Sequence, residues 1–258
     1  MNNTVCKTIE ILKLVAANKD GLTLSQIVRE LDLPKSTVFN IVRSLAQLDM
    51  LRVTEDKLPT YRLGVESLKL GLSYLSSTSL DTAARPVLSA LCRDTNETVF
   101  MSVRSGDTDL VYIMKYPSEM EFQTICSVGT VRHMLSVAMG KAMLSTMRDE
   151  EIRGIITPDM FCKCSVPAIT DIPSLLEYIH KTQSLGYAVE ATIENPQFAS
   201  SVAAPVLDLD DQLVGAVSIV IMSDPYNMDR VTALGKRVNA AALEISRNLG
   251  YMKDALYS

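Results

Sequence analysis

The chain contains only two histidines, and its five cysteines are an odd number scattered over 258 residues. Disulfide frameworks belong to short secreted domains, so we expect all five cysteines to be reduced thiols. Cys162 and Cys164 form a C-x-C pair, but no second cysteine pair accompanies it, and we therefore expect no metal site. The shortage of histidine also leaves few candidates for a catalytic general base.

Long apolar runs are lacking as well. The longest, residues 213–222, contains Ser218 and is far shorter than the roughly 20 residues that a membrane-spanning helix needs. The N-terminus leads directly into a helical pattern, without the basic and apolar regions of a signal peptide. We therefore expect a cytoplasmic protein with no membrane partner.

Charge is distributed unevenly along the chain. The net charge of −5 by itself argues against a nucleic-acid binder. Residues 1–62, however, carry nine basic and seven acidic side chains, whereas the remainder carries 16 basic and 23 acidic ones. The length suits two unequal domains. A mildly basic module joined to an acidic one fits a DNA-reading head on a body that does not touch DNA.

Three helices are predicted in the first fifty residues. Apolar residues at three- and four-residue steps predict a helix over residues 4–17. Thr23 and Gln26 have the spacing of a capping box at the start of a second helix, and Pro34 suits the first turn of a third. The apolar face of the third helix comprises Val38, Ile41, Val42 and Leu45.

The opposite face of the third helix is polar. Asn and Gln suit adenine, Arg suits guanine, and hydroxyls serve either base or phosphate. Such a face can also be simply solvated, and for a single helix that alternative stays open. The expected DNA contacts of this helix-turn-helix are Ser25, Lys35, Ser36, Thr37, Asn40, Arg43 and Gln47.

Two short strands are predicted next, at residues 50–54 and 60–63, with a polar turn between them. Three helices followed by a two-stranded ribbon predict a winged helix. Arg52, Lys57 and Arg62 would lie on or near this wing, available to phosphates, although each could also be an ordinary surface charge.

The rest of the chain predicts an α+β domain. Helices are expected at residues 64–77, 81–96, 137–148, 149–156, 171–185 and 228–249. Strands are expected at residues 98–104, 110–115, 122–126, 187–192, 201–209 and 213–221, with a tight hairpin at Asp210-Asp211. Antiparallel strands with helices on one side are typical of an α+β domain.

A set of short motifs occurs in order along nearly the whole chain. They are Leu22-Thr23-Leu24, Leu33-Pro34-Lys35-Ser36-Thr37-Val38, Tyr61-Arg62-Leu63-Gly64, Ala84-Arg85-Pro86-Val87-Leu88, Asn96-Glu97-Thr98-Val99, Gly140-Lys141-Ala142, Leu185-Gly186-Tyr187 and Val202-Ala203-Ala204-Pro205-Val206. This ordered set strongly resembles the isocitrate-lyase-regulator (IclR) family of transcriptional regulators.

The chain departs from the family pattern in the helix-turn-helix. Asp32 stands where the family usually has Gly, and Asp tolerates a left-handed turn better than most residues. Phe39 and Asn40 stand where the family usually has His or Tyr and then Arg. The missing Arg weakens the case for a family-typical operator sequence but leaves DNA binding intact.

The resemblance implies a winged helix-turn-helix (residues 1–63), a linker helix (64–80) and a GAF/PAS-like effector-binding and oligomerisation domain (81–258). It implies a homodimer or tetramer on a pseudo-palindromic operator in double-stranded DNA. It further implies a small organic-acid or sugar-acid effector, and no cofactor.

Gly140-Lys141-Ala142 is not a phosphate-binding loop, because Leu135 and Ala142 occupy the places of its other Gly and its Ser or Thr. By resemblance, effectors bind where this helix begins, and side chains of later strands complete the site. The implied effector-binding residues are Ala138, Met139, Glu190, Ser218, and Ser201 or Ser200. Glu190 stands where the family usually has Asp, Ser201 (or Ser200) where it has Cys, and Val220 where it has Ser. These differences indicate an altered ligand.

Two other functions fit less well. No Ser-His-Asp, H-E-x-x-H, G-x-S-x-G or paired-Cys motif is visible, so we do not expect an enzyme. A winged helix that contacts protein would favour aromatic and apolar anchors over a polar row. We therefore expect a sequence-specific DNA-binding regulator, a repressor, whose operator affinity is modulated by its effector.

Overall fold

In the computed structural model, the described residues are 3–54, 58–77, 80–120, 124, 126–190, 200–222 and 227–257. The chain forms two compact units, Met1–Thr78 and Ser79–Ser258, each with its own core. The predicted domain boundaries at residues 63 and 80 stay predictions. Within the described ranges, no helix is long and apolar enough to cross a membrane.

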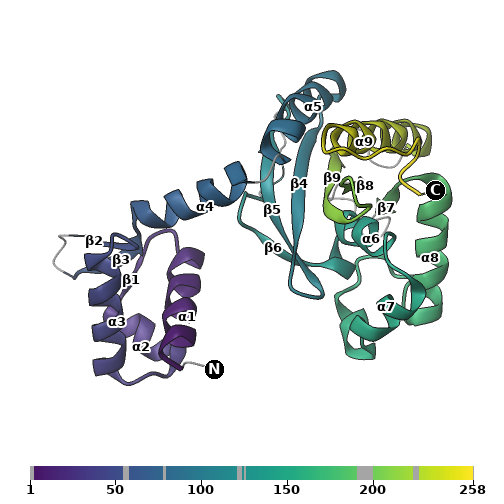
Figure 1. The fold of residues 1–258 in the computed structure, drawn as a ribbon. Coiled ribbons are helices and arrows are strands. Elements are labelled where there is room, and N and C mark those ends of the chain that lie inside the picture. The colour runs from purple at the N-terminus through teal and green to yellow at the C-terminus, as the bar shows by residue number, and fades with distance from the viewer. Residues whose placement is uncertain are drawn as a thin grey trace. The chain divides into compact units, whose positions relative to one another are not determined.

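The N-terminal unit is a helix-turn-helix with a small antiparallel sheet (Figure 1). Its helices are α1 (Asn3–Ala17), α2 (Leu24–Leu31), α3 (Lys35–Gln47) and α4 (Val65–Ser77). Its strands are β1 (Leu22–Thr23), β2 (Leu51–Val53) and β3 (Thr60–Leu63), in the order β1-β3-β2. The sequence predicted a two-stranded ribbon, and the structure adds β1 as a third strand. β1 was not predicted because two residues are too few to show a periodicity.

Capping residues set where α2 begins and ends. The Thr23 hydroxyl accepts the Gln26 N–H at 3.3 Å, and the Gln26 side chain accepts the Thr23 N–H at 2.7 Å, which confirms the capping box. Asp32 ends the helix in the left-handed region, at φ 49°. The chain then turns into α3, whose four predicted apolar residues are all buried.

The C-terminal unit is built on one six-stranded antiparallel sheet, in the order β6-β5-β4-β9-β8-β7. The strands are β4 (Thr98–Ser105), β5 (Asp109–Tyr116), β6 (Val131–His133), β7 (Ala188–Glu190), β8 (Ser200–Leu207) and β9 (Leu213–Ile221). The helices are α5 (Leu80–Thr95), α6 (Ala138–Leu144), α7 (Asp149–Ile155), α8 (Ile172–Leu185) and α9 (Met228–Asn248), with 3₁₀ turns at Met134–Ser136 and Pro158–Lys163.

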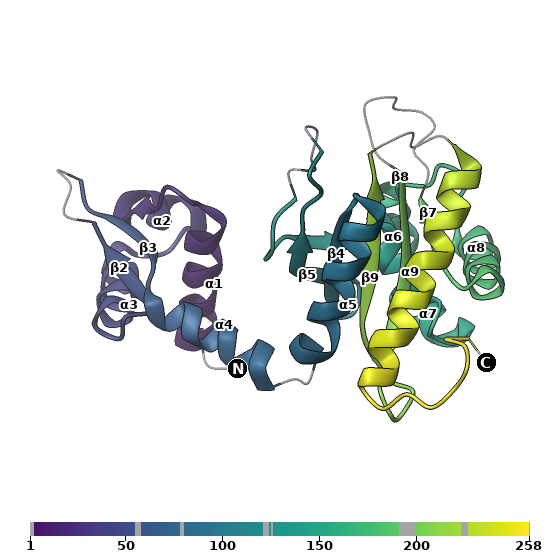
Figure 2. The ribbon, with the colours of Figure 1, turned by 90° about the horizontal axis from the view of Figure 1, so that it is seen from above.

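Helices cover both faces of this sheet. α5 and α9 pack on one face, and α6, with α7 and α8 beyond it, packs on the other (Figure 2). The expectation of helices on one side was therefore wrong, although the α+β class is correct. Helical periodicity shows which side of a helix is apolar, but it carries no information about which sheet face that side covers.

Some predicted elements differ in the structure. The expected strand at residues 122–126 lies largely outside the described residues. β6, which the sequence did not predict, pairs with β5. The expected helix at 137–148 is only seven residues long, as α6. Beyond Glu190, the expected strand at 187–192 leaves the described part of the chain.

Candidate DNA interface and effector site

The polar face of α3 is open to solvent. The Ser44 hydroxyl donates to the backbone carbonyl of Asn40 at 3.0 Å, and the predicted contact side chains of α3 make no hydrogen bond among the described residues. The four apolar residues on the other face bind the helix to the domain core. Of the predicted contacts on α2 and α3, Thr37 is half-buried and the others are exposed, namely Ser25, Lys35, Ser36, Asn40, Arg43 and Gln47. These side chains are available to a DNA groove.

The wing residues differ from one another. Arg52 is exposed on β2, whereas Lys57 lies outside the described residues. Arg62 on β3 donates from Nε to the carbonyl of Asp20 at 3.1 Å. Its side chain also packs against Gly21, where an added Cβ would lie 2.7 Å from the Arg62 Cγ. Arg62 therefore supports the turn before β1 and keeps its other N–H donors for a phosphate.

Three of the predicted effector residues lie on the sheet face that α6 covers. Glu190 pairs directly with Ser201 across β7 and β8, and Ser218 pairs with Ala203, two residues along β8. Because side chains alternate across a strand, Ser201 and Ser218 share the face of Ala203, which packs in the α6 core. Glu190 and Ser218 are buried, and Ser201 is half-buried.

The other three predicted effector residues are placed differently. Ser200 falls on the opposite face of β8, toward α5 and α9, because its alternate neighbour Val202 packs in that core. Ala138 and Met139 begin α6 and are both buried. The sulfur of Met139 accepts a hydrogen bond from the Ser102 hydroxyl at 3.2 Å. Of the two candidate serines, Ser201 is thus the one that shares a face with Glu190.

A buried ion pair joins α6 to β7. The Lys141 side chain is fully buried, and its Nζ lies 3.4 Å from the Glu190 carboxylate and 2.8 Å from the Ser165 hydroxyl. A buried ammonium is costly unless a counter-charge and hydrogen bonds compensate it. Glu190 therefore has a structural role, because it supplies the counter-charge for the fully buried ammonium of Lys141.

The glycine before this lysine allows a close approach. A Cβ on Gly140 would lie 2.1 Å from the carbonyl oxygen of Met134, so only glycine lets α6 sit directly on the 3₁₀ turn that precedes it. Gly140 and Lys141 also donate their backbone N–H groups to Val137, at 3.2 and 3.3 Å. The start of α6 thus has fewer open donors than the sequence suggested.

Aromatic residues border the same sheet face. The rings of Phe100 and Tyr112 lie 5.1 Å apart between centroids, and both are buried in the α6 core. Burial raises the pKa of the Tyr112 hydroxyl to about 12. This hydroxyl is therefore protonated at neutral pH and can donate a hydrogen bond.

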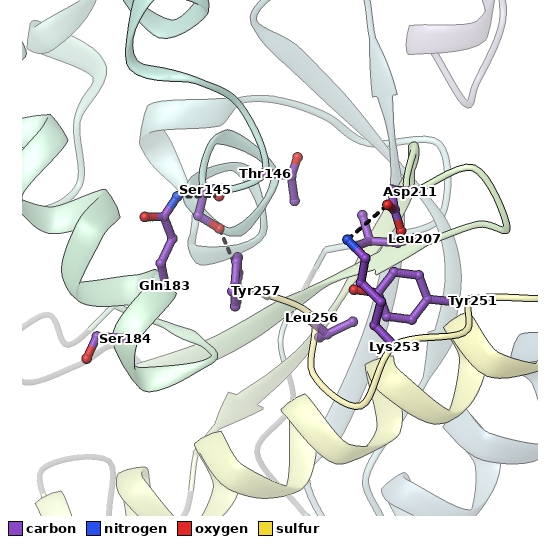
Figure 3. A pocket seen from close by; sticks show the side chains of 10 residues that line it. All are labelled: Ser145, Thr146, Gln183, Ser184, Leu207, Asp211, Tyr251, Lys253, Leu256 and Tyr257. Carbon is purple, nitrogen blue, oxygen red and sulfur yellow. Dashed lines mark hydrogen bonds and ion pairs between the residues drawn. The ribbon is translucent and has the colours of Figure 1, made fainter.

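Two hollows in the C-terminal unit lie elsewhere. One, of about 460 Å³, is open to solvent, and two contacts join residues of its lining (Figure 3): Tyr257 with Ser145 at 2.6 Å and Lys253 with Asp211 at 2.9 Å. The other, of about 370 Å³, lies beside the outer edge of β7, and its lining is mostly apolar. Neither is lined by a predicted effector residue, and the expected site adjoins residues 191–199, outside the described part.

Sequence reasoning missed Lys141, Ser165 and Tyr178. Lys141 was seen only as part of a motif, yet its neighbours on α6 are almost all apolar, and this pattern indicates a buried lysine. Ser165 and Tyr178 lie far from Glu190 along the chain, so no local signal connects them. The hydroxyl of Tyr178 bonds the backbone of Val189, one residue before Glu190.

Comparison with known proteins places the chain among transcriptional regulators. It is 29% identical over 251 residues to the HTH-type transcriptional regulator KipR of Bacillus subtilis, covering 97% of this chain and 98% of that protein. It is 26% identical over 242 residues to the HTH-type transcriptional repressor AllR of Escherichia coli, covering 94% and 88%.

Solved structures share the fold. IclR of Thermotoga maritima has a TM-score of 0.74 and 25% identity, covering 97% of this chain and all of that one. An IclR homologue of Microbacterium hydrocarbonoxydans, complexed with 4-hydroxybenzoate, has a TM-score of 0.79 and 17% identity, covering 96% and 99%.

The family models match both units. Residues 4–55 match the IclR helix-turn-helix domain, and residues 72–247 match the model described as bacterial transcriptional regulator IclR C-terminal. The second match alone spans more than half of the chain. This protein therefore belongs to the IclR family of bacterial transcriptional regulators.

Proposed function

We propose that this protein is a cytoplasmic repressor that binds a pseudo-palindromic operator through α3 and releases it in response to a small organic acid. The observation that carries the proposal is the open polar face of α3, held outward by its buried apolar face. Helix, turn and helix is the geometry that places such a face in the major groove. The relatives named as regulator and repressor support this direction.

The effector is expected on the α6 face of the sheet. Glu190, Ser201 and Ser218 lie together there and offer hydrogen-bond acceptors and hydroxyl donors. Support for an organic acid comes from the homologue of Microbacterium hydrocarbonoxydans, which holds 4-hydroxybenzoate. An effector shifts operator affinity only through its preference for one arrangement of the protein.

A homodimer, single or paired into a tetramer, completes the proposal, because a pseudo-palindrome needs two recognition helices. Exposed apolar side chains support a contact between copies. On α4 they follow helical spacing at Val65, Leu68 and Leu72, and on α1 they include Val5 and Ile9. Sedimentation of the full-length protein tests this part, and Leu68→Glu should shift the assembly toward the monomer. A monomer in the parent protein would contradict it.

The DNA-binding test uses duplexes selected from random DNA by the full-length protein. Asn40→Ala combined with Arg43→Ala should abolish preference for the selected sequence and retain weak general binding in fluorescence anisotropy. Specific binding that persists unchanged in the double variant would show that α3 does not read DNA.

The effector test is a thermal-shift screen of the full-length protein against small organic acids, sugar acids and aromatic acids. A compound that binds only the folded state adds about 2.7 kcal/mol of stability at a hundredfold excess over its dissociation constant. A shift confined to one chemical class, together with weakened DNA binding, would identify the effector. DNA binding that is unchanged by every stabilising compound would contradict effector control.

A further inference from the structure

Phe39 is an aromatic ring on the surface of the recognition helix. Its exposed fraction is 45%, and it is the one aromatic residue among the large exposed apolar side chains of the described residues. It is absent from the buried core, which α3 supplies with four other residues. Among the described residues, its ring makes no contact with another ring or with a cation. The fold of the domain therefore does not explain this side chain.

The position of Phe39 on α3 indicates a use. Lys35, Phe39 and Arg43 follow one another at four-residue steps, so they form one row along the helix. Both neighbours in this row are exposed basic residues that suit phosphate and guanine. A helix that lies in the major groove with Arg43 against base edges also brings the Phe39 ring to the floor or wall of that groove.

The major groove offers one apolar group to such a ring, the C5-methyl of thymine. We infer that Phe39 is a specificity-determining residue that selects thymine by contact with this methyl group. The inference rests on the proposed recognition of DNA by α3. The half-buried Thr37 has a methyl group on the same helix that could make the same contact. The experiment must therefore distinguish Phe39 from Thr37.

The test replaces single thymines by deoxyuridine, which lacks only the methyl group, in the duplex selected from random DNA by the full-length protein. In the parent protein, at least one replacement per half-site should weaken binding about fourfold, the effect of removing one buried methyl(ene) group. The same replacement should leave the affinity of Phe39→Ala unchanged. Thr37→Ser should remain as sensitive as the parent protein.

Leu48→Ala is the matched control. Leu48 is an exposed apolar residue just beyond α3, and it lies about two and a half turns from Phe39, on the opposite side of the helix. This variant should retain the full deoxyuridine effect. Circular dichroism of all variants confirms that the domain is folded.

Two results would overturn the inference. In one, Phe39→Ala loses as much affinity as the parent protein on each deoxyuridine duplex, so another group reads the methyl. In the other, no thymine responds to the replacement in the parent protein. A selection that yields no preferred sequence would overturn the proposed function itself, and the inference with it.

Discussion

A single phenol satisfies both backbone groups of one edge-strand residue. The hydroxyl of Tyr178 on α8 donates to the carbonyl of Val189 and accepts the N–H of the same residue, the latter at 3.0 Å. Val189 is the middle residue of β7, and β7 pairs with β8 on one side only. The phenol therefore closes an edge that would otherwise present unpaired polar groups. Burial raises the pKa of the Tyr178 hydroxyl well above its usual value, so the proton needed for donation stays in place.

Tyr178→Phe should destabilise the protein, because it leaves the N–H and carbonyl of Val189 unpaired. We expect the free energy of unfolding to fall by about 2 kcal/mol, as measured by urea denaturation of the full-length chain. Tyr187→Phe is the control, since the hydroxyl of buried Tyr187 makes no hydrogen bond in the described part of the chain. An equal fall in the free energy of unfolding in the two variants would show that the hydrogen bonds to Val189 do not stabilise the protein.

The Lys141–Glu190 pair predicts non-additive substitutions. Lys141→Met should cost about 3 kcal/mol of stability, because a mostly buried carboxylate loses its cation. Adding Glu190→Gln should recover part of that loss, since the double variant buries no charge in this pair. A double-mutant cycle by chemical denaturation measures this coupling. Simple addition of the two single losses would contradict a direct pairing.

This pair also changes how a Glu190 variant must be read. Glu190→Ala leaves the ammonium of Lys141 buried without its partner, so lost effector response in that variant would mix recognition with stability. Glu190→Gln in the Lys141→Met background separates the two effects. If Glu190 binds the effector, response should stay impaired in this double variant while DNA affinity without effector is normal.

Gly140→Ala should disturb the packing of α6 on the preceding 3₁₀ turn. The added Cβ would meet backbone atoms of Met134 at 2.1 to 2.5 Å, and overpacking of this kind typically costs about 1–3 kcal/mol. Gly154→Ala is the matched control on α7, where an added Cβ meets nothing within 4 Å. That variant should gain about 0.5–1 kcal/mol from helix propensity. Thermal unfolding of both variants checks the opposite signs.

His133 predicts a pH dependence of stability. Its Nδ1 accepts the N–H of Leu135 at 3.2 Å, and burial, with Lys163 nearby, lowers the pKa of the imidazole below 6.5. Below about 6.5 the unfolded chain therefore binds the proton more readily than the folded one. The free energy of unfolding should fall as pH decreases from 6.5 through the folded-state pKa. Above pH 7, the contribution of His133 to this free energy should not change with pH.

The measurement is urea denaturation of the parent protein and His133→Asn between pH 5 and 7.5. Asn keeps a side-chain acceptor for the turn but does not titrate, so the acid-side slope should become shallower. An unchanged slope in His133→Asn would contradict this assignment.

Local patterns in the sequence predicted the N-terminal unit well. The capping box at Thr23, the left-handed Asp32 and the apolar face of α3 all depend on residues within one or two turns of each other. Such contacts leave a periodic trace in the sequence. Strand β1 left no such trace, because Leu22 and Thr23 form a strand only by pairing with β3.

The proposed effector site was predictable only by resemblance, and the chemistry of its residues depends on distant contacts. Lys141 and Glu190 are 49 residues apart, and Ser165 joins them from a third segment. No window of sequence contains this arrangement. Strand alternation, by contrast, follows directly from the register, and it places Ser201 rather than Ser200 beside Glu190.

The sheet assigns alternate residues of β8 and β9 to two different cores. Val202 and Val217 pack toward α5 and α9, while Ser201 and Ser218 lie on the α6 side. An exchange at Ser201 or Ser218 therefore changes what the α6 side presents and leaves the other core intact. In the proposed effector site, single substitutions at these positions would therefore change ligand preference between descendants of one ancestral gene without loss of foldability.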